Sequence, residues 1–380
     1  MDNVKAKKCS GLTVLYRLSP AGHIIAAVSG IVIAAHLLTR GNRALMILAS
    51  EKIVQPIHRA LARLNSHLPF SVAELLIGLA AAAVLVYIIF VVVSLFTGRG
   101  RLRKLYAAVI NLLAAGLAVY AGFCMLWGVY YYGDDFMTRS GLESDNVSVA
   151  QLETVTEYFA KLANEYAEQV PRDADGNYIA DRDAILARSN EVYANIEQKL
   201  PCLAGPAVRA KGVYFSRIMS YTDFTGFFFP FTAEANVKTD CPPALFASTV
   251  AHELAHQRGV AKEQEANFAA VLASLEYGDP EYCYSACLLA YTHLGNALYS
   301  ANYDAWKNIY LTLSDNVLRD FAANREYWAQ FETPVQKVSN TVYEGFLYSY
   351  DQNMGLKSYG ACVDLLVNYY FEQACAALGS

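Results

Sequence analysis

The sequence predicts a mainly α-helical protein in which three membrane-spanning helices precede a mostly helical domain with a small β-sheet. Of its 380 residues, 55% are hydrophobic, which is more than a soluble protein usually contains. The long uncharged runs lie in the first third of the chain, and the remainder mixes charged with apolar residues at helical spacing. We therefore expect a membrane region over residues 1–133 and a globular domain over residues 134–380.

Two uncharged runs are long enough to cross a bilayer as helices. Residues 75–96 contain no charged side chain, and at 1.5 Å per residue such a helix spans a hydrocarbon core of about 30 Å. Residues 106–132 are also uncharged and end in Trp127 and three consecutive tyrosines, a composition typical of a membrane interface. Both runs are predicted to be transmembrane helices.

Two further segments of the membrane region have helical patterns. Residues 21–38 are rich in Ile, Val and Ala, but His23 and His36 interrupt the run. We expect a third transmembrane helix there, and a cleaved signal peptide is the alternative. Residues 43–68 carry apolar side chains at helical spacing, which fits either a helix on the membrane surface or a plain connecting helix.

Basic residues in the short loops predict the orientation of the spans. They gather in residues 5–17, before the first span, and in residues 99–104, between the second and third. Cytoplasmic loops carry an excess of Lys and Arg. Although residues 40–63 are also basic, the pattern predicts a multi-pass protein of the bacterial cytoplasmic membrane whose globular domain is extracytoplasmic.

The globular domain is predicted to be helical except in one segment. Residues 149–169 and 181–200 have apolar residues three and four positions apart, as in amphipathic helices. Residues 212–237 are dense in aromatic and β-branched residues, which favours strands and turns. Two prolines then precede a predicted helix over residues 244–256, where they suit its first turn.

Composition argues against two classes of site. A net charge of −5 and the absence of clustered Lys and Arg indicate that nucleic acid is not a partner. The eight cysteines include no CxxC pair, so a cysteine-based zinc site is not expected.

The segment His252-Glu253-Leu254-Ala255-His256 carries the clearest chemistry in the chain. On a helix, His252 and His256 project from one face, so both imidazoles can reach one tetrahedral Zn²⁺. Glu253 lies about 100° around the helix, beside the open coordination position, where its carboxylate can take a proton from a water molecule. We therefore expect one Zn²⁺ per chain, with Glu253 as the catalytic general base.

A catalytic zinc normally takes three protein ligands, and the next segment supplies carboxylates. Gly259 offers a helix stop, and the helix that follows can fold back across the first. Glu263 and Glu265 are the candidates. Lys262 occupies the position at which metzincins have a third histidine, and a protonated lysine cannot bind zinc.

Glu263-Gln-Glu-Ala-Asn267 resembles the ExxxD signature of gluzincin peptidases. That resemblance implies a zincin-like fold in which Glu263 is the third ligand and Asn267 orients a zinc-bound histidine by accepting a hydrogen bond from its imidazole. Asn in place of Asp is a departure, because a neutral amide polarises an imidazole less than a carboxylate does.

A wider resemblance runs through Trp127-Gly-Val-Tyr-Tyr, Met219-Ser-Tyr, residues 226–236, residues 252–268 and Ser358-Tyr-Gly360. These segments look like an uncharacterised membrane-anchored family, domain of unknown function 3810. What the resemblance implies is a membrane-bound zinc peptidase.

In gluzincins an edge strand before the metal helix holds the substrate. The strand placed similarly here implies a cleft lined by Thr232, Glu234 and Asn236. The alternative is that this segment packs in the core or at a membrane-facing rim. Peptide hydrolysis also gains from a side chain that stabilises the tetrahedral oxyanion. We expect Tyr359 in that role, with His293 as the second choice.

The sequence therefore predicts a membrane-anchored zinc metalloendopeptidase that acts on a peptide or protein. The alternative is a zinc-binding membrane sensor or scaffold without turnover, and Glu253 favours the enzyme because structural metal binding would not need a carboxylate between the histidines. A membrane structural protein without metal is a third possibility.

Overall fold

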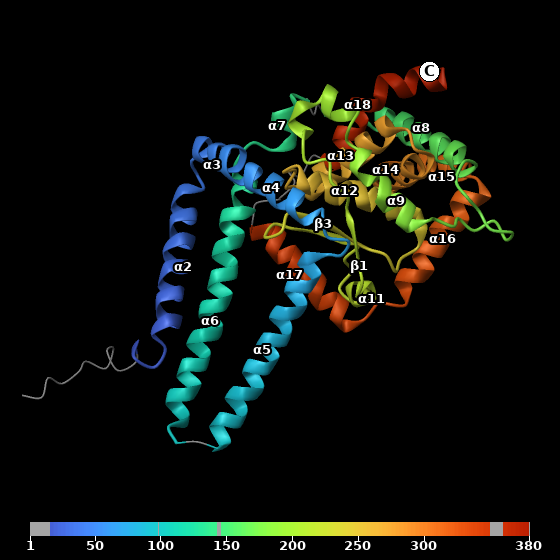
Figure 1. Cartoon of the computed structure of the whole chain (residues 1–380). Helices are drawn as coiled ribbons and strands as arrows, with labels where there is room; N and C mark the ends of the chain where they lie inside the picture. The colour runs from blue at the N-terminus through green and yellow to red at the C-terminus, as the bar shows by residue number, and fades with distance from the viewer. Residues whose placement is uncertain (1–15, 98, 143–145, 350–359, 380) are drawn as a thin grey trace, which may run out of the picture. The chain divides into compact units, whose positions relative to one another are not determined.

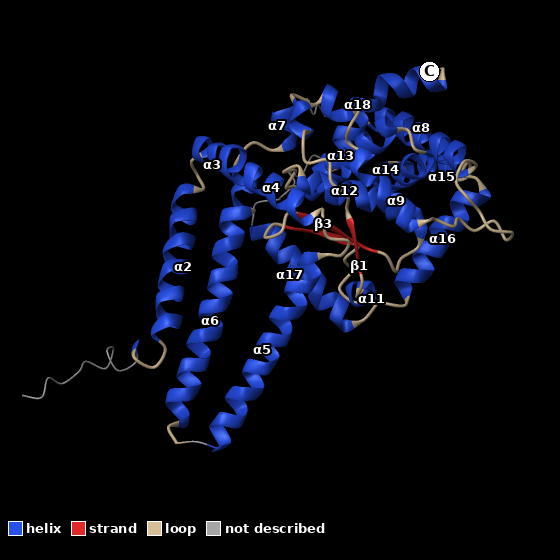
Figure 2. Ribbon diagram, in the orientation of Figure 1, coloured by secondary structure: helices blue, strands red, loops and turns tan. Residues whose placement is uncertain are grey.

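The structure is a computed structural model that describes residues 16–97, 99–142, 146–349 and 360–379 (Figure 1). It confirms a mainly helical chain with one small sheet (Figure 2). The described chain divides into two compact units. The first contains the residues up to Ser50 together with Glu74–Gly133, and the second contains Glu51–Ala73 and the chain from Asp134 onward.

Among its described residues, the first unit contains three helices that are long and apolar enough to cross a membrane, as predicted. They are α2 (Pro20–Thr39), α5 (Val72–Thr97), which begins in the second unit, and α6 (Arg101–Leu126). None of the most apolar window of α5 is buried within the protein, which is the arrangement expected of a helix whose side chains face lipid. The third helix ends before its predicted limit, because the chain tightens into the 3₁₀ helix η2 (Gly128–Tyr132).

The segment between the first two spans forms α3 (Arg43–Ala49), the π-helix η1 (Ser50–Val54) and α4 (Gln55–Asn65). The last of these helices lies within the second unit and is bonded to other parts of that unit by polar side chains. Asn65 donates a hydrogen bond to the carbonyl of Thr232 at 2.8 Å, and Arg59 donates to the carbonyl of Ala204 at 2.9 Å. Residues 51–73, placed by sequence in the membrane region, therefore group with the globular unit.

The second unit contains the sheet, which has three strands in the order β1-β3-β2. β1 (Lys211–Val213) runs parallel to β3 (Glu234–Lys238), and β2 (Gly226–Phe229) runs antiparallel to β3 with Phe227 opposite Asn236. These strands lie within or beside the segment predicted to form strands. Among the described strands, β2 is therefore an edge strand.

The first helices of this unit follow the sequence pattern only in part. α8 (Val149–Ala167) begins at a capping box formed by Ser148 and Gln151 and matches the predicted helix. The continuous helix predicted over residues 181–200 is wrong: the structure has α9 (Arg182–Arg188), η3 (Ser189–Glu191) and α10 (Ile196–Lys199). At the break, Ser189 Oγ donates to the Leu186 carbonyl at 2.7 Å and accepts from the Ala210 amide at 3.0 Å, and such side-chain bonds compete with the helical ladder.

The two prolines form the 3₁₀ turn η5 (Pro243–Leu245), from which α12 (Phe246–Gln257) starts. This helix packs against β2, β3, α13 and α14 and buries most of its surface. The other elements are α7 (Phe136–Ser140), η4 (Pro201–Leu203), α11 (Ser216–Ser220), α13 (Glu263–Tyr277), α14 (Pro280–Ala301), α15 (Tyr303–Tyr310), α16 (Asp315–Ala329), α17 (Pro334–Ser349) and α18 (Ala361–Leu378). The core thus holds α12 rigidly between the sheet and the neighbouring helices.

Candidate metal centre

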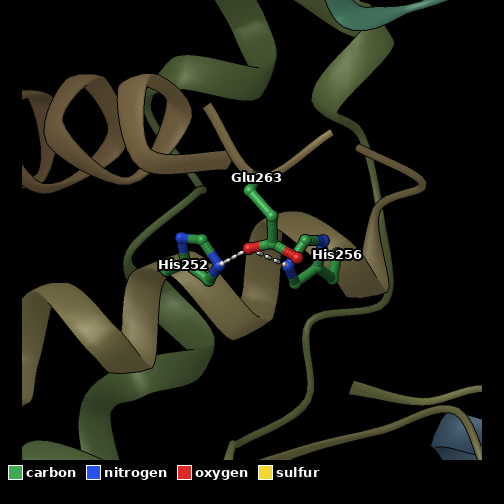
Figure 3. Close-up of side chains that lie close together, drawn as sticks. All are labelled: His252, His256 and Glu263. Atoms are coloured by element: carbon green, nitrogen blue, oxygen red, sulfur yellow. Dashed lines mark hydrogen bonds and ion pairs between the residues drawn. The ribbon is translucent and has the colours of Figure 1, made fainter. Parts of the chain in front are cut away.

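α12 and the start of α13 bring together the three side chains that the sequence predicts as metal ligands. His252 and His256 are one turn apart on α12, with ring centroids 4.6 Å apart. α12 ends at Gln257, and two residues later Gly259 has a φ of +81°, in the left-handed region that favours glycine. The chain then turns back, and Glu263, the first residue of α13, faces the two imidazoles (Figure 3).

The three side chains offer ligand atoms within 4.8 Å of one another. Oε2 of Glu263 lies 3.1 Å from Nε2 of His252 and 3.6 Å from Nε2 of His256. Two ligands of a tetrahedral ion with bonds of 2.0–2.1 Å lie roughly 3.3–3.4 Å apart. The spacing of Oε2 from both nitrogens therefore fits a single small cation between them.

The outer nitrogen of each imidazole is held by a hydrogen-bond acceptor. Nδ1 of His252 lies 2.8 Å from Oδ1 of Asn267, and Nδ1 of His256 lies 2.7 Å from the carbonyl oxygen of Val260. Since an amide oxygen and a carbonyl oxygen only accept, both Nδ1 atoms carry hydrogen, so in the neutral form of each ring the lone pair of Nε2 would face inward. This is the tautomer and orientation that a metal-binding histidine needs.

The electrostatics of the cluster favour positive charge at its centre. Burial alone would lower the pKa of His256, but the Glu263 carboxylate raises that pKa to about 9. Burial alone would raise the pKa of Glu263, yet the two imidazoles hold it well below its ordinary value. A carboxylate that stays ionised between two histidines is a suitable anionic ligand for a divalent cation.

Glu253 lies beside the cluster and is buried, with 4% of its surface exposed. Its Oε2 has no hydrogen-bond partner among the described residues, and burial raises the pKa of this carboxyl to about 7. An unpaired buried carboxylate oxygen is costly unless a ligand or a proton satisfies it. The donor set and this orphaned oxygen together fit a metal ion with a reactive group next to it.

Glu265, the other candidate for third ligand, lies away from the cluster. It is 2% exposed, and its Oε2 accepts a hydrogen bond from the Phe136 amide at 2.9 Å. Its Oε1 is 4.0 Å from Nζ of Lys262. Burial raises the pKa of Glu265 to about 6. The structure therefore brings Glu263 and not Glu265 to the histidines.

The three residues predicted to line a cleft are buried. Glu234 accepts hydrogen bonds from the amides of Val72 and Ala73 and from Nζ of Lys211 at 3.2, 2.8 and 2.6 Å. Asn236 accepts one from Ser71 Oγ at 2.6 Å. Oγ1 of Thr232 is buried without a partner among the described residues. Glu234 and Asn236 thus anchor the start of α5, and a role in a cleft stays a prediction.

Of the two residues predicted to stabilise an oxyanion, Tyr359 lies outside the described residues. His293 is on α14, where burial lowers its pKa and the charge of His252 lowers it further. Its side chain is therefore within electrostatic reach of the cluster.

The sequence interpretation missed two residues that touch the site. Tyr343 of α17 donates a hydrogen bond to Oε1 of Glu263 at 2.7 Å. Gly226 of β2 lies against the Glu253 side chain. No spacing rule connects Tyr343 to a motif 80 residues earlier, whereas Gly226, a small residue within an aromatic strand, is the kind of signal that marks a close approach of the backbone.

One family model matches the chain, over residues 50–367; its description is "Protein of unknown function (DUF3810)". Neither a curated protein nor a solved structure matches. The family match covers most of the chain, including the whole cluster and its neighbours. The chain belongs to the DUF3810 family, as the sequence resemblance implied.

Proposed function

We propose that this member of the DUF3810 family is a membrane-anchored zinc metalloendopeptidase of the gluzincin type, with a zincin-like globular domain. The observation that carries the proposal is the position of Glu263 Oε2, at 3.1 and 3.6 Å from two imidazole nitrogens whose outer nitrogens are both fixed by acceptors. Two histidines and one carboxylate are the ligand set of many catalytic zinc sites.

His252, His256 and Glu263 would hold the ion, and Asn267 would keep His252 in its binding orientation. A bound zinc ion would supply Lewis-acid chemistry toward a water molecule and a peptide carbonyl. Glu253 is the proton carrier. Its buried Oε2, which has no hydrogen-bond partner among the described residues, is the atom that can accept and release the proton.

The edge strand beside Glu253 supports a peptide as the substrate. The Lys238 amide donates to the Thr225 carbonyl at 2.9 Å, which extends the β2–β3 ladder by one pair. Hydrogen-bonded and non-hydrogen-bonded pairs alternate in an antiparallel ladder. The N–H and C=O groups of Gly226 and Phe228 therefore point to the free edge, where an extended peptide can pair.

The alternative is a zinc-binding sensor or scaffold, and the buried, unpaired Glu253 favours the enzyme. The test begins with zinc analysis of purified full-length protein, with about one zinc per chain expected, and none after His252→Ala or His256→Ala. Glu253→Gln should retain zinc but lower peptide hydrolysis by at least about a hundredfold. Equal zinc in all variants would remove the metal site, and unchanged turnover in Glu253→Gln would remove the catalytic role.

We also propose that the globular domain is extracytoplasmic, in the bacterial cytoplasmic membrane. The proposal rests on four basic residues where α5 gives way to α6: Arg99 lies between the two helices, and Arg101, Arg103 and Lys104 lie in the first turn of α6. A reporter enzyme that works only outside the cytoplasm should then be active when it is fused after the last residue. Cytoplasmic activity of the fusion would reverse the orientation.

A further inference from the structure

The two oxygens of Glu263 have different surroundings. Oε2 faces the imidazoles, whereas Oε1 accepts the hydrogen bond from the Tyr343 hydroxyl at 2.7 Å. A hydrogen bond from a hydroxyl to an ionised carboxylate is stronger than one between neutral groups. The hydrogen bond from Tyr343 keeps Oε1 turned toward the hydroxyl and leaves Oε2 as the oxygen that can reach a cation.

Tyr343 reaches Glu263 because α17 docks on the turn that precedes β2. Its ring packs edge-on against Phe224, with centroids 5.1 Å apart. Ser339 Oγ donates to the Thr222 carbonyl and Asn340 Nδ2 donates to Asp223 Oδ2, both at 3.0 Å. Three consecutive residues of this turn, 222–224, therefore contact one face of α17.

The attachment of α17 is light. None of its described side chains is fully buried, and Val335, Val338 and Val342 are 58%, 64% and 68% exposed. Segments with few buried apolar contacts open locally at low free-energy cost. Undocking of α17 would withdraw the Tyr343 hydroxyl while leaving α12 and α13, which are packed in the core, in place.

We propose that Tyr343 is a positioning residue of the metal centre: its hydroxyl restrains Glu263 to bind zinc through one oxygen, so that zinc affinity depends on the docking of α17. This inference rests on the zinc site of the proposed function. Without the hydroxyl, Glu263 rotates more freely and Oε1 can also approach the ion, which changes both affinity and coordination number.

The test measures zinc affinity of the full-length protein by competition with a chelator. Tyr343→Phe keeps the ring on Phe224 and removes only the hydroxyl, and it should weaken zinc binding by about tenfold, the lower end of what the loss of an outer hydrogen bond to a ligand costs. With Co²⁺ in place of zinc, the visible absorption of this variant should weaken, because coordination expands beyond four ligands. Tyr299→Phe, at an exposed tyrosine of α14, is the matched control and should change neither measurement.

A double-mutant cycle tests the dependence on α17. The combined change Ser339→Ala and Asn340→Ala should weaken zinc binding in the wild-type background and have no further effect in the Tyr343→Phe background. Additive losses would overturn the coupling, and wild-type affinity and spectrum in Tyr343→Phe would overturn the role of the hydroxyl. Either result leaves the proposed function standing as long as zinc still depends on His252, whereas a wild-type protein that binds no zinc refutes both.

Discussion

Gly226 of β2 lies in direct contact with the side chain of Glu253. A Cβ atom at Gly226 would come within 2.6 Å of Oε1 and 2.7 Å of Cγ of Glu253, and within 2.9 Å of the carbonyl oxygen of Asn236. Distances under 3.0 Å are not found for real Cβ contacts. The strand therefore passes the carboxylate at a point where only a hydrogen atom fits, and the backbone of β2 helps to fix the position of Glu253.

Gly226→Ala should displace Glu253 without touching a metal ligand. Hydrolysis is expected to fall by about a hundredfold, the effect of a misplacement of about 1 Å in a catalytic group. Zinc content should stay near one per chain, because the ligands come from α12 and α13. Peptide turnover and metal analysis of the same preparation measure the two effects.

Gly116→Ala is the matched control, because a Cβ at this helical glycine of α6 meets no atom within 4 Å among the described residues. It should leave turnover and zinc content unchanged. Full activity in Gly226→Ala would show that the position of Glu253 does not depend on this contact.

Asn267 is the position where the chain departs from the gluzincin signature, and its Oδ1 lies 2.8 Å from Nδ1 of His252. Asn267→Asp should tighten zinc binding several-fold, since a carboxylate polarises the ring more strongly than an amide does. Asn267→Ala should weaken it by about 10- to 100-fold. Chelator competition measures both, and equal affinity in the three proteins would show that this hydrogen bond does not contribute to metal binding.

The parts of the site that follow a local rule could be predicted from the sequence. His252, His256 and Glu263 are placed by helical spacing and by one glycine stop, and Asn267 follows one turn later. Tyr343 and Gly226 could not be assigned in this way, because their positions depend on how α17 and β2 pack on distant elements.

The same limit applies to the fold. Uncharged runs were sufficient to locate the three apolar helices. The contacts that group residues 51–73 with the second unit could not be predicted, because they depend on bonds from Arg59 and Asn65 to backbone carbonyls of distant loops. Such single hydrogen bonds produce no periodic pattern in the sequence.

Lys238, the last residue of β3, is a fully buried lysine surrounded by aromatic rings. Its Nζ lies 4.3 Å from the ring centroid of Tyr327 and 4.4 Å from that of Trp328, and it donates a hydrogen bond to the Tyr327 hydroxyl at 2.6 Å. Burial lowers the pKa of Lys238 to about 8. The residue attaches α16 to the sheet.

The lowered pKa of Lys238 predicts a pH dependence of stability. Below pH 8 this lysine is charged in both the folded and the unfolded state, and burial of the charge opposes folding. Between about pH 8 and its ordinary value of 10.5, the unfolded state binds more protons, so this residue makes the free energy of unfolding rise with pH. The unfolding midpoint of wild type should therefore rise relative to that of Lys238→Met across this interval. A difference between the two midpoints that is constant with pH would contradict the lowered pKa.

Glu263 and Glu265 should respond to mutation in opposite ways, although two positions separate them. Glu263 has an oxygen at both imidazoles, and Glu265 holds the buried Phe136 amide at the start of α7. Glu263→Ala should weaken zinc binding by at least about tenfold. Glu265→Ala should leave zinc affinity within about threefold, since the Glu265 oxygens contact the Phe136 amide and Lys262 rather than a proposed zinc ligand. It should lower the free energy of unfolding by about 1–3 kcal/mol, because a buried N–H loses its acceptor. Chelator competition and thermal unfolding of the zinc-free protein separate the two effects. The reverse order of zinc affinities would move the ligand by two residues, and the role of Asn267 would then be lost, because the residue one turn after Glu265 is Ala269, whose side chain can accept no hydrogen bond.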